Sequence, residues 1–544
     1  PLRVPSGCAF GCIPTKPSTA SSSPLARVAA ALPWGGKCFT RVDATGEDAE
    51  DETLDKPTSP DGGLRHMSMS DIWKLSAQET ASFIRKRDLS AHDSVGAALA
   101  RLNAVNPKLN AVVEPMAETA LKQAKALDQL QADGGSLGPL HGVPVTIKIN
   151  IDQEGSATSN GVVAFKDIIA QADAPVVENL RKAGAVIIGR TNTPEFSFRA
   201  DTQNPLFGRT HNPWGQHISA GGSSGGAGAA VMAGIGALAH GNDIGGSLRF
   251  PAAANGAVTL KPGLGRVPAW NVSQKEERGI LAQAMSVQGV LARRAGDLDL
   301  AMPSLMHPHS GDPFHVPLPY RLANHDGPVR VAFCPDTPGF ETHPEIRKGL
   351  DNAASALKDA GYFVEQTEPP LLEETALMGY RSLLGEVSTL LGPDIKAYGS
   401  PQVQQIFKDY FDYFPPFEGD ALLKNLGQRT HYARQWGLFM EKYPLILAPF
   451  LPQPFFAPNR DCEGLAGVSD VLGAALWSYS INFIGHPSGC LPAGLAEIKG
   501  QPYPINVQLI AQRWREDLCV AALQDIEARL GYLCDDLWQR MGAP

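Results

Sequence analysis

The sequence predicts an α/β protein, in which helices and strands alternate along the chain. A period-two apolar pattern at 142–151 predicts a strand. The stretch PVVENLRKAGAVIIGRTN (175–192) then predicts a helix followed by a buried strand. The same rhythm returns in PVRVAFCPD, HPEIRKGLDNAASALKDAG and YFVEQ, between residues 328 and 366. This order is typical of a sheet that carries helices on its faces.

The first part of the chain predicts no folded structure. Residues 1–66 contain the cluster KPSTASSSP and the acidic run DATGEDAEDETLD, with little apolar periodicity. Such a composition is typical of disorder, and no basic start precedes an apolar core as in a targeting peptide. We therefore expect a leader without catalytic role, followed by a single domain over residues 67–544.

Helices are predicted directly after the leader. SAQE at 76–79 fits a capping box, in which Ser76 binds free N–H groups of the first helical turn. Apolar residues then recur at helical spacing up to Leu102, and again from Ala120 to Leu127.

The strand predicted at 142–151 has two different faces. Alternation places the apolar side chains on one face: Val143, Val145, Ile147, Ile149 and Ile151. The other face carries Thr146, Lys148 and Asn150. This strand therefore presents a lysine on a polar face.

Glycine clusters surround three serines in the middle of the chain. GGSSGG (221–226) precedes an alanine-rich helix, and NDIGGSLRFP (242–251) contains a second glycine pair. Such clusters mark sharp turns or close approach of the backbone to a ligand. Short strands are predicted around ALAHGND (237–243) and AVTLKP (257–262).

A helical but irregular segment follows at 373–460, which we expect to form a lid over the core together with residues 305–330. Aromatic residues gather in and after this segment: Tyr410, Phe411, Tyr413, Phe414, Phe417, Phe450, Phe455 and Phe456. They predict either an apolar or aryl pocket, or a plain hydrophobic core beneath the lid.

Composition narrows the function classes. The net charge of −9 argues against a nucleic-acid binder, because binding phosphates needs a basic face. The eight cysteines form no CxxC pair, which favours reduced thiols in a cytoplasmic protein. The most apolar run, residues 226–239, is too short to cross a bilayer, so no membrane anchor is predicted.

Three motif matches lack their expected context. GGSSG (221–225) fits the GxSxG nucleophile elbow, which would make Ser223 the nucleophile, but NPWGQHISA before it is not an apolar strand. GAGAA (226–230) lacks the strand of a dinucleotide site, and no phosphate-binding P-loop is present. The histidines of HPHSGDPFH, which are His307, His309 and His315, are expected in an exposed loop and not at a metal.

Several longer motifs occur in a specific order. They are GVPVTIKIN, RTNTPEFSF, NPWGQHISAGGSSGGAGAAVMAG, GNDIGGSLRFPAAANGAVTLKP, GHPSGCLPAG and PINVQLIAQRWREDL. In these motifs the chain resembles the amidase signature family from about Met69 almost to its end. The resemblance implies a central mixed, twisted β-sheet covered by helices on both faces, a signature core at about 140–265 and a helical lid.

The resemblance also implies roles for individual residues. Ser247 corresponds to the nucleophile, Ser223 to a proton relay and Lys148 to the base. The chemistry is reasonable, because a serine hydroxyl needs a base and a lysine becomes neutral when burial disfavours its charge.

The glycine-rich loops receive a role from the same resemblance. A cis peptide bond is expected between Gly222 and Ser223, and the backbone N–H groups of Ile244, Gly245, Gly246 and Ser247 are expected to form an oxyanion hole. Supporting roles are expected for Gly222, Ser224, Asp243 and Arg249.

Four positions depart from the usual family pattern: Ile149, Asn242, Thr259 and Gly263. They leave the subfamily open and remove no catalytic group. The resemblance implies a hydrolase of small-molecule amides, with aryl amides, carbamates (urethanes) and esters as expected substrates, without metal or cofactor, and monomeric or homodimeric. Two alternatives remain, a glutamine-hydrolysing subunit of a tRNA-dependent amidotransferase and a catalytically silent binding protein.

Overall fold

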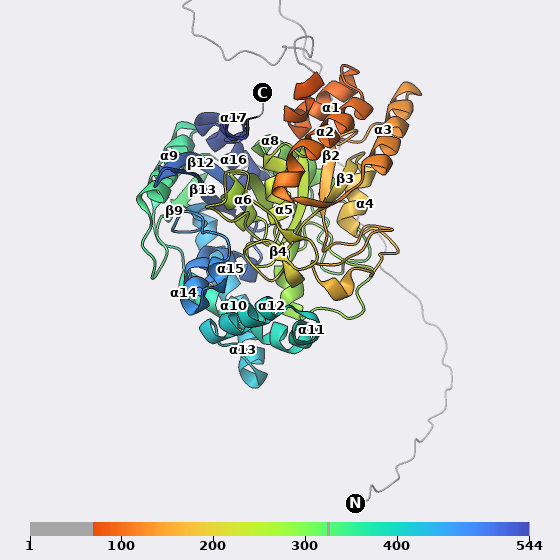
Figure 1. Cartoon of the computed structure of the whole chain (residues 1–544). Coiled ribbons are helices and arrows are strands. Elements are labelled where there is room, and N and C mark those ends of the chain that lie inside the picture. Colours follow the sequence, from red (N-terminus) through yellow and green to blue (C-terminus); the bar gives the residue numbers. More distant parts are fainter. Residues whose placement is uncertain (1–68, 324–326, 543–544) are drawn as a thin grey trace, which may run out of the picture. The chain divides into compact units, whose positions relative to one another are not determined.

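An eleven-stranded mixed β-sheet is the centre of the fold, in the order β1-β3-β2-β6-β8-β7-β12-β13-β11-β9-β10 (Figure 1). The computed structural model describes residues 69–323 and 327–542. The leader predicted at 1–66 lies outside the described residues.

The strands confirm the predicted α/β alternation. Their bounds are β1 Val112–Pro115, β2 Pro144–Lys148, β3 Val186–Thr191, β6 Leu238–Asp243, β7 Val258–Lys261, β8 Val287–Ala292, β9 Arg330–Phe333, β10 Phe363–Gln366, β11 Leu445–Pro449, β12 Ser488–Ile498 and β13 Gln501–Ala511. A separate two-stranded sheet pairs β4 (Gln203–Asn204) with β5 (Gly208–Arg209). Strand β2 runs parallel to both of its neighbours, β3 and β6, whereas β6, β8, β7, β12 and β13 are antiparallel in succession.

The helices are α1 Ala77–Lys86, α2 Ala91–Leu109, α3 Ala117–Ala132, α4 Pro175–Lys182, α5 Gly225–Met232, α6 Arg249–Asn255, α7 Ile280–Met285, α8 Ala295–Leu305, α9 Pro344–Asp359, α10 Leu372–Leu390, α11 Gly392–Tyr398, α12 Pro401–Tyr413, α13 Gly419–Lys442, α14 Gly464–Val468, α15 Leu476–Ile484, α16 Glu516–Leu530 and α17 Cys534–Arg540. Short helical turns are η2 Met69–Lys74, η3 Val163–Phe165, η4 Glu195–Ser197, η5 Arg460–Cys462 and the π-helical η6 Ser469–Gly473. The capping box predicted for α1 is present, with Ser76 and Glu79 each bonding the other's backbone N–H.

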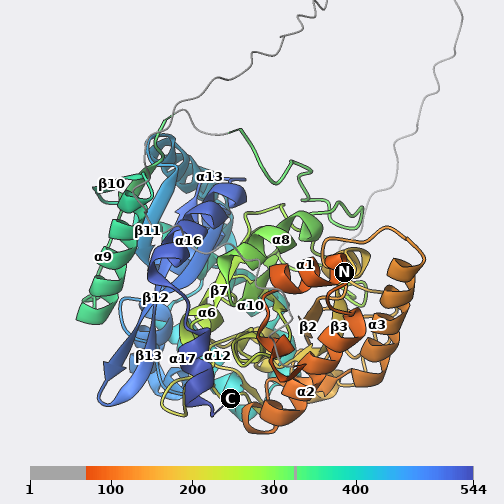
Figure 2. The same cartoon turned by 90° about the horizontal axis from the view of Figure 1, so that it is seen from above.

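Helices cover both faces of the sheet, as predicted. One apolar cluster joins the sheet to α4, α8, α9 and α16, and another joins the opposite face to α5, α6, α10 and α12–α15. Strand β11 shows the alternation: Leu445 and Leu447 belong to the first cluster, Ile446 and Ala448 to the second. Seen from above, α1–α3 lie at one end of the sheet and α9 with β10 at the other (Figure 2).

The prediction of a helical but irregular segment at 373–460 did not include a strand that the structure shows there. Residues 445–449 form β11, which pairs antiparallel with β13 and parallel with β9. Its sequence, LILAP, is buried throughout, and a short apolar run of this kind does not distinguish a buried strand from a buried helix.

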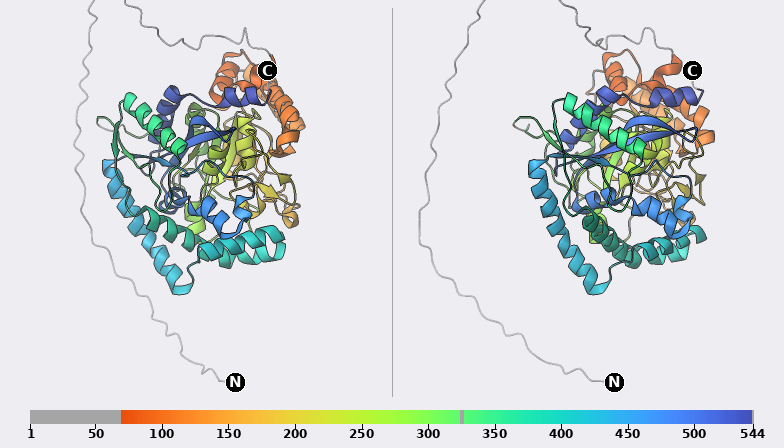
Figure 3. Two further views of the ribbon diagram at one scale, coloured as in Figure 1. Left: turned by 60° about the vertical axis from the view of Figure 1, so that its left-hand side comes forward. Right: turned by 90° about the vertical axis from the view of Figure 1, so that its left-hand side faces the viewer.

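Most of the remaining segment is helical, and we call α10–α13 the lid helices, whereas residues 450–459 form an irregular loop. They lie together on one side of the sheet in both side views (Figure 3). Of the aromatic residues noted in the sequence, Tyr410, Phe414, Phe450 and Phe455 are buried in the core cluster on this face. Phe411, Tyr413, Phe417 and Phe456 are only partly buried. For the first four, the hydrophobic-core interpretation holds.

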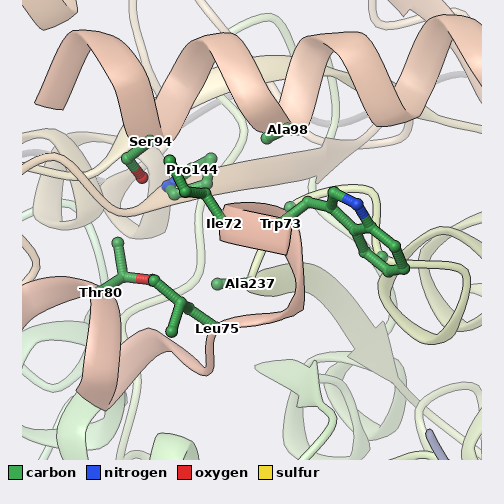
Figure 4. Close-up of a pocket in the computed structure, with 10 residues that line it drawn as sticks. Ile72, Trp73, Leu75, Thr80, Ser94, Ala98, Pro144 and Ala237 are labelled. Atoms are coloured by element: carbon green, nitrogen blue, oxygen red, sulfur yellow. The ribbon is translucent and has the colours of Figure 1, made fainter. Parts of the chain in front are cut away.

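Two cavities lie away from the glycine-rich loops. One, of about 10 Å³, is bordered by η2, α2 and Pro144 at the start of β2 (Figure 4). The other, of about 720 Å³, is lined by residues 334–338, 366–369 and 371–374. Neither is lined by Lys148, Ser223 or Ser247. No helix within 69–323 and 327–542 has the length and hydropathy needed to cross a membrane.

Candidate active site

Lys148 is the last residue of β2, and its side chain is completely buried (0% exposed). Its Nζ lies 2.7 Å from Ser223 Oγ and 2.8 Å from Asn242 Oδ1. The apolar residues Val145 and Ile147 of β2 point to the opposite face, as the alternation predicts. The polar face of this strand is therefore also buried, as the proposed role of Lys148 as a neutral base requires.

Burial changes the acid–base character of this lysine. Removal from water lowers the pKa of Lys148 well below its ordinary value, and the nearby Asp243 carboxylate opposes that shift only in part. Its partners at hydrogen-bond distance are uncharged, and Nζ forms no ion pair within the described part of the chain. A neutral amine can accept a proton, which an ammonium group cannot.

Ser223 lies in a turn whose flanking positions, Gly222 and Gly226, have no space for a side chain. The Gly222–Ser223 peptide bond is cis, as expected. A Cβ on Gly222 would lie 2.4 Å from the carbonyl oxygen of Arg199, and one on Gly226 would lie 2.4 Å from the backbone nitrogen of Asn192. These glycines let the turn and the start of α5 pack directly on the backbone of residues 192–201.

Ser247 lies in the loop between β6 and α6, and it is half-buried. The two serine loops are adjacent, since the N–H of Ser224 donates to the carbonyl oxygen of Ser247 over 3.2 Å. Ser247 Oγ forms no hydrogen bond with any described residue. The structure thus joins Lys148 to Ser223 directly, and it brings Ser247 beside them without an Oγ–Oγ hydrogen bond.

Asp243 and Arg249 brace the Ser247 loop. Both are fully buried, and Arg249 Nη2 lies 3.0 Å from Asp243 Oδ1. Although burial opposes ionisation, the Arg249 guanidinium lowers the pKa of Asp243 to about 2. The carboxylate also accepts the N–H of Gly246 at 2.8 Å and that of Leu248 at 3.1 Å, so it fixes the backbone on both sides of Ser247.

The hydrogen bond to Asp243 changes the expected set of oxyanion donors. It occupies the Gly246 N–H, so the set of four is reduced to three. The N–H groups of Ile244, Gly245 and Ser247 donate to no group in the described residues. Ile244, Gly245 and Ser247 are also half-buried, so these three donors lie at an accessible part of the loop.

Known proteins with similar sequences identify the family of this chain. A family model described as "Amidase" matches residues 93–520. The chain belongs to the amidase signature family. The amidase is 43% identical to an indoleacetamide hydrolase of Bradyrhizobium diazoefficiens, over 86% of this chain and 89% of the relative. It is 31% identical to an acylamidase of Rhodococcus erythropolis, over 85% and 97% of the two chains.

Solved structures support the same fold. A bacterial aryl acylamidase of the amidase signature family matches the amidase with a TM-score of 0.73 and 25% identity, over 86% of this chain and 98% of that one. The predicted family, fold class and enzyme class are therefore confirmed: the chain is an amide hydrolase.

Sequence analysis missed several residues at this site of the amidase. His240 on β6 accepts the backbone N–H of Lys148 at Nδ1 over 3.4 Å, and its Nε2 lies 3.0 Å from Gln288. Burial lowers the pKa of His240 to about 4, so this ring is neutral near pH 7. No motif signals it, because only the pairing of β2 with β6 brings His240 to the lysine.

Helix α15 also contributes to the site of the amidase. Ser478 donates to the carbonyl oxygen of Gly245 at 3.0 Å, and a Cβ on Gly245 would lie only 3.2 Å from the Tyr479 ring. The Tyr479 ring stacks on Tyr380 of α10, with 4.2 Å between ring centres. Aromatic side chains of the lid side therefore border the loop that carries Ser247.

The histidines His307, His309 and His315 lie in an irregular segment, as expected. His309 Nε2 lies 3.4 Å from the Glu178 carboxylate. Within 69–323 and 327–542, no group of three or more His, Cys, Asp or Glu residues is arranged to hold a metal ion.

Proposed function

We propose that the amidase hydrolyses amide bonds with Ser247 as nucleophile, Ser223 as proton relay and Lys148 as base. The observation that carries this proposal is the contact of 2.7 Å between Ser223 Oγ and a lysine nitrogen that is completely buried and has no charged partner at hydrogen-bond distance. A depressed lysine pKa beside a serine is the arrangement that activates a hydroxyl near neutral pH.

In the first half of the reaction, Ser247 Oγ attacks the carbonyl carbon of the substrate. Its proton passes to Ser223 Oγ, while the proton of Ser223 passes to Lys148 Nζ. The negative charge that forms on the carbonyl oxygen is stabilised by the N–H groups of Ile244, Gly245 and Ser247. The transfer requires the Ser223–Ser247 hydrogen bond to form once substrate is bound, as catalytic contacts often tighten in the complex.

The carbon–nitrogen bond then breaks. The leaving nitrogen takes a proton from Ser223, which is replenished from the ammonium group of Lys148, and Ser247 is left as an acyl ester. Water attacks this ester and gives its proton to Ser223, and from there to Lys148. Release of the carboxylic acid returns Ser247 Oγ its proton by the reverse path, so base and relay end as they began.

We propose a primary amide with an aryl-alkyl acyl group as substrate, of which indole-3-acetamide is the first to test. The relative with 43% identity is named an indoleacetamide hydrolase. The stacked rings of Tyr380 and Tyr479 beside Gly245 offer an aromatic surface next to the reacting carbonyl. Aryl amides, carbamates and esters form the rest of the substrate panel.

A fluorophosphonate probe tests the role of the serines. We expect the wild type to be labelled at Ser247, and Ser247→Ala to lose both labelling and indole-3-acetamide hydrolysis by at least about 10³-fold. The nucleophile-elbow alternative expects the label on Ser223 instead. Hydrolysis at wild-type rate by Ser247→Ala, in a folded protein, would refute the proposal.

The same preparation separates the two remaining alternatives. A subunit of a tRNA-dependent amidotransferase should prefer glutamine as amide donor, whereas the proposed enzyme hydrolyses aryl-alkyl amides alone and without partner proteins. A binding protein would show neither labelling nor turnover.

A further inference from the structure

The amide side chain of Asn242 is the second partner of the proposed base. Asn242 is at the end of β6, and its Oδ1 lies 2.8 Å from Lys148 Nζ. A carbonyl oxygen accepts hydrogen bonds and donates none. It therefore takes one N–H of Lys148, and it leaves the lone pair of a neutral amine for the hydroxyl of Ser223.

A second asparagine fixes the direction of this amide. Asn242 Nδ2 donates to Asn150 Oδ1 at 2.9 Å, and Asn150 Nδ2 lies 3.2 Å from Asn242 Oδ1. The two side chains thus form a reciprocal amide pair. Turning Asn242 over would place its NH₂ group against Lys148 and its oxygen against the oxygen of Asn150.

The hydroxyl of Ser197 fixes the direction of Asn150 in turn. Ser197 Oγ has a single proton, which it donates to Asn160 Oδ1 at 2.6 Å, and Thr193 Oγ1 lies 3.0 Å away. Ser197 Oγ therefore accepts from Asn150 Nδ2 at 2.9 Å. Ser197 thus donates to Asn160, Asn150 donates to Ser197, and Asn242 donates to Asn150. These directions leave the Oδ1 acceptor of Asn242 facing Lys148.

The backbone around this network is strained. Ser197, its neighbour Phe196 and Asn160 all have positive φ, of 54°, 55° and 49°. Non-glycine residues adopt this left-handed region rarely, and such conformations persist where the surroundings hold them in place. Ser197 and Asn160, which orient the amide pair, are thus held in backbone conformations of raised energy.

We infer that Asn242, oriented by Asn150, is a positioning residue that holds the uncharged form of Lys148 with its lone pair toward Ser223. This inference rests on the proposed roles of Lys148 and Ser223. An uncharged acceptor binds the amine without favouring the ammonium form as a carboxylate in the same place would. The threonine usual in the family at this position has a hydroxyl that can accept the same hydrogen bond.

The charged and titratable groups that face β2 come from its two neighbours. Strand β6 contributes His240 and Asp243, and β3 contributes Arg190, which donates to the carbonyl oxygen of Ile151. These groups stay in place in variants of Asn242. A change in the pH dependence of such variants therefore reports the new side chain at position 242.

Asn242→Asp places a carboxylate beside Nζ without changing the size of the side chain. An opposite charge at this distance raises a lysine pKa by about 1–3 units. We expect the acidic limb of kcat/KM for indole-3-acetamide to move to higher pH by at least about one unit, with a loss of at least about tenfold at the wild-type midpoint and recovery above the new limb. The rate of fluorophosphonate labelling should follow the same shift without depending on substrate binding.

Three further substitutions distinguish a positioning role of Asn242 from general damage to the site. Asn242→Thr should keep the wild-type acidic limb, and Asn242→Leu should lower kcat at every pH without moving the limb upward. Asn150→Leu should lower kcat by about tenfold in the wild type and by less than about threefold in the Asn242→Thr background, because a hydroxyl needs no amide partner to orient it.

Asn425→Asp on α13, where the half-buried side chain bonds the Ala421 carbonyl oxygen, is the control for added charge, and it should leave the pH profile unchanged. If Ser247→Ala is inactive but folded Asn242→Asp keeps the acidic limb of the wild-type pH profile, this inference is overturned and the proposed function stands. An active Ser247→Ala protein would instead overturn the proposed function on which the inference rests.

Discussion

At the scale of single residues, burial at the end of β2 lowers the pKa of Lys148. The sequence placed this lysine correctly on the face of β2 opposite to Val145 and Ile147, because alternation is a local property. Burial of this lysine was expected from its implied role as a base, but local patterns did not predict that α5 and β6, far along the chain, bury that face. The role of Asn242 was also missed, since only the folded structure brings Asn150 beside it.

Lys148→Met should change how stability depends on pH. The folded-state pKa of Lys148 is lowered, so the unfolded chain binds one more proton between that pKa and about 10.5, and wild-type stability falls as pH falls through this window. Relative to Lys148→Met, we expect the wild type to lose about 1.4 kcal/mol of unfolding free energy per pH unit there. Urea unfolding at pH 7, 8 and 9 measures this difference, and parallel curves for the two proteins would contradict a neutral lysine.

At the scale of elements, the turns and helices with strong local signals were predicted. The capping box of α1 and the pair formed by α4 and β3 have the expected bounds within a few residues. Strand β11 was not predicted, because a buried strand of five residues has no amphipathic pattern. The hydrogen bond from the Gly246 N–H to the Asp243 side chain was not predicted either, because the glycine pattern does not encode it.

The glycine turn before α5 gives a test at this scale. In Gly222→Ala the new Cβ meets the Arg199 carbonyl oxygen at 2.4 Å, and the backbone on both sides is fixed. We expect a loss of at least about 2–3 kcal/mol in unfolding free energy together with most of the activity. Gly437→Ala in α13, where nothing lies within 4 Å of the new Cβ, should instead stabilise by up to about 1 kcal/mol. Equal unfolding free energies for both variants would show that the turn is not packed as described.

At the scale of the whole described unit, buried and partly buried polar contacts tie residues 195–199, on which the Ser223 turn packs, to α12 and η5. Arg199, two residues after Ser197, binds Asp461 through two hydrogen bonds of 2.7 and 2.9 Å. Glu195 accepts the N–H of Ser400 at 3.0 Å, at the start of α12. Such long-range pairs leave no trace in local sequence patterns, so the resemblance to the family predicted a lid but not its attachment.

Removing the Arg199 guanidinium tests this attachment. Arg199→Met leaves the Asp461 carboxylate buried without its cation, and we expect a loss of about 3–5 kcal/mol in unfolding free energy. Arg460→Met, next to the same aspartate in the sequence, removes only exposed ion pairs with Glu463 and Asp470 and should cost less than about 1 kcal/mol. Chemical denaturation of both variants measures the contrast, and similar losses would refute a buried anchor at Arg199.

The position of the proposed base at the end of a strand has a consequence for how this enzyme can change. Neighbours in a strand point to opposite sides, so a shift of β2 by one residue would replace Lys148 on the catalytic side with the hydrocarbon of Ile147 or Ile149. Parallel pairing with β3 and β6 on both edges resists such a shift. A single inserted or deleted residue within Pro144–Ile147 would therefore inactivate the enzyme by moving the lysine to the other face of the sheet, although the five family motifs outside this strand would be unchanged.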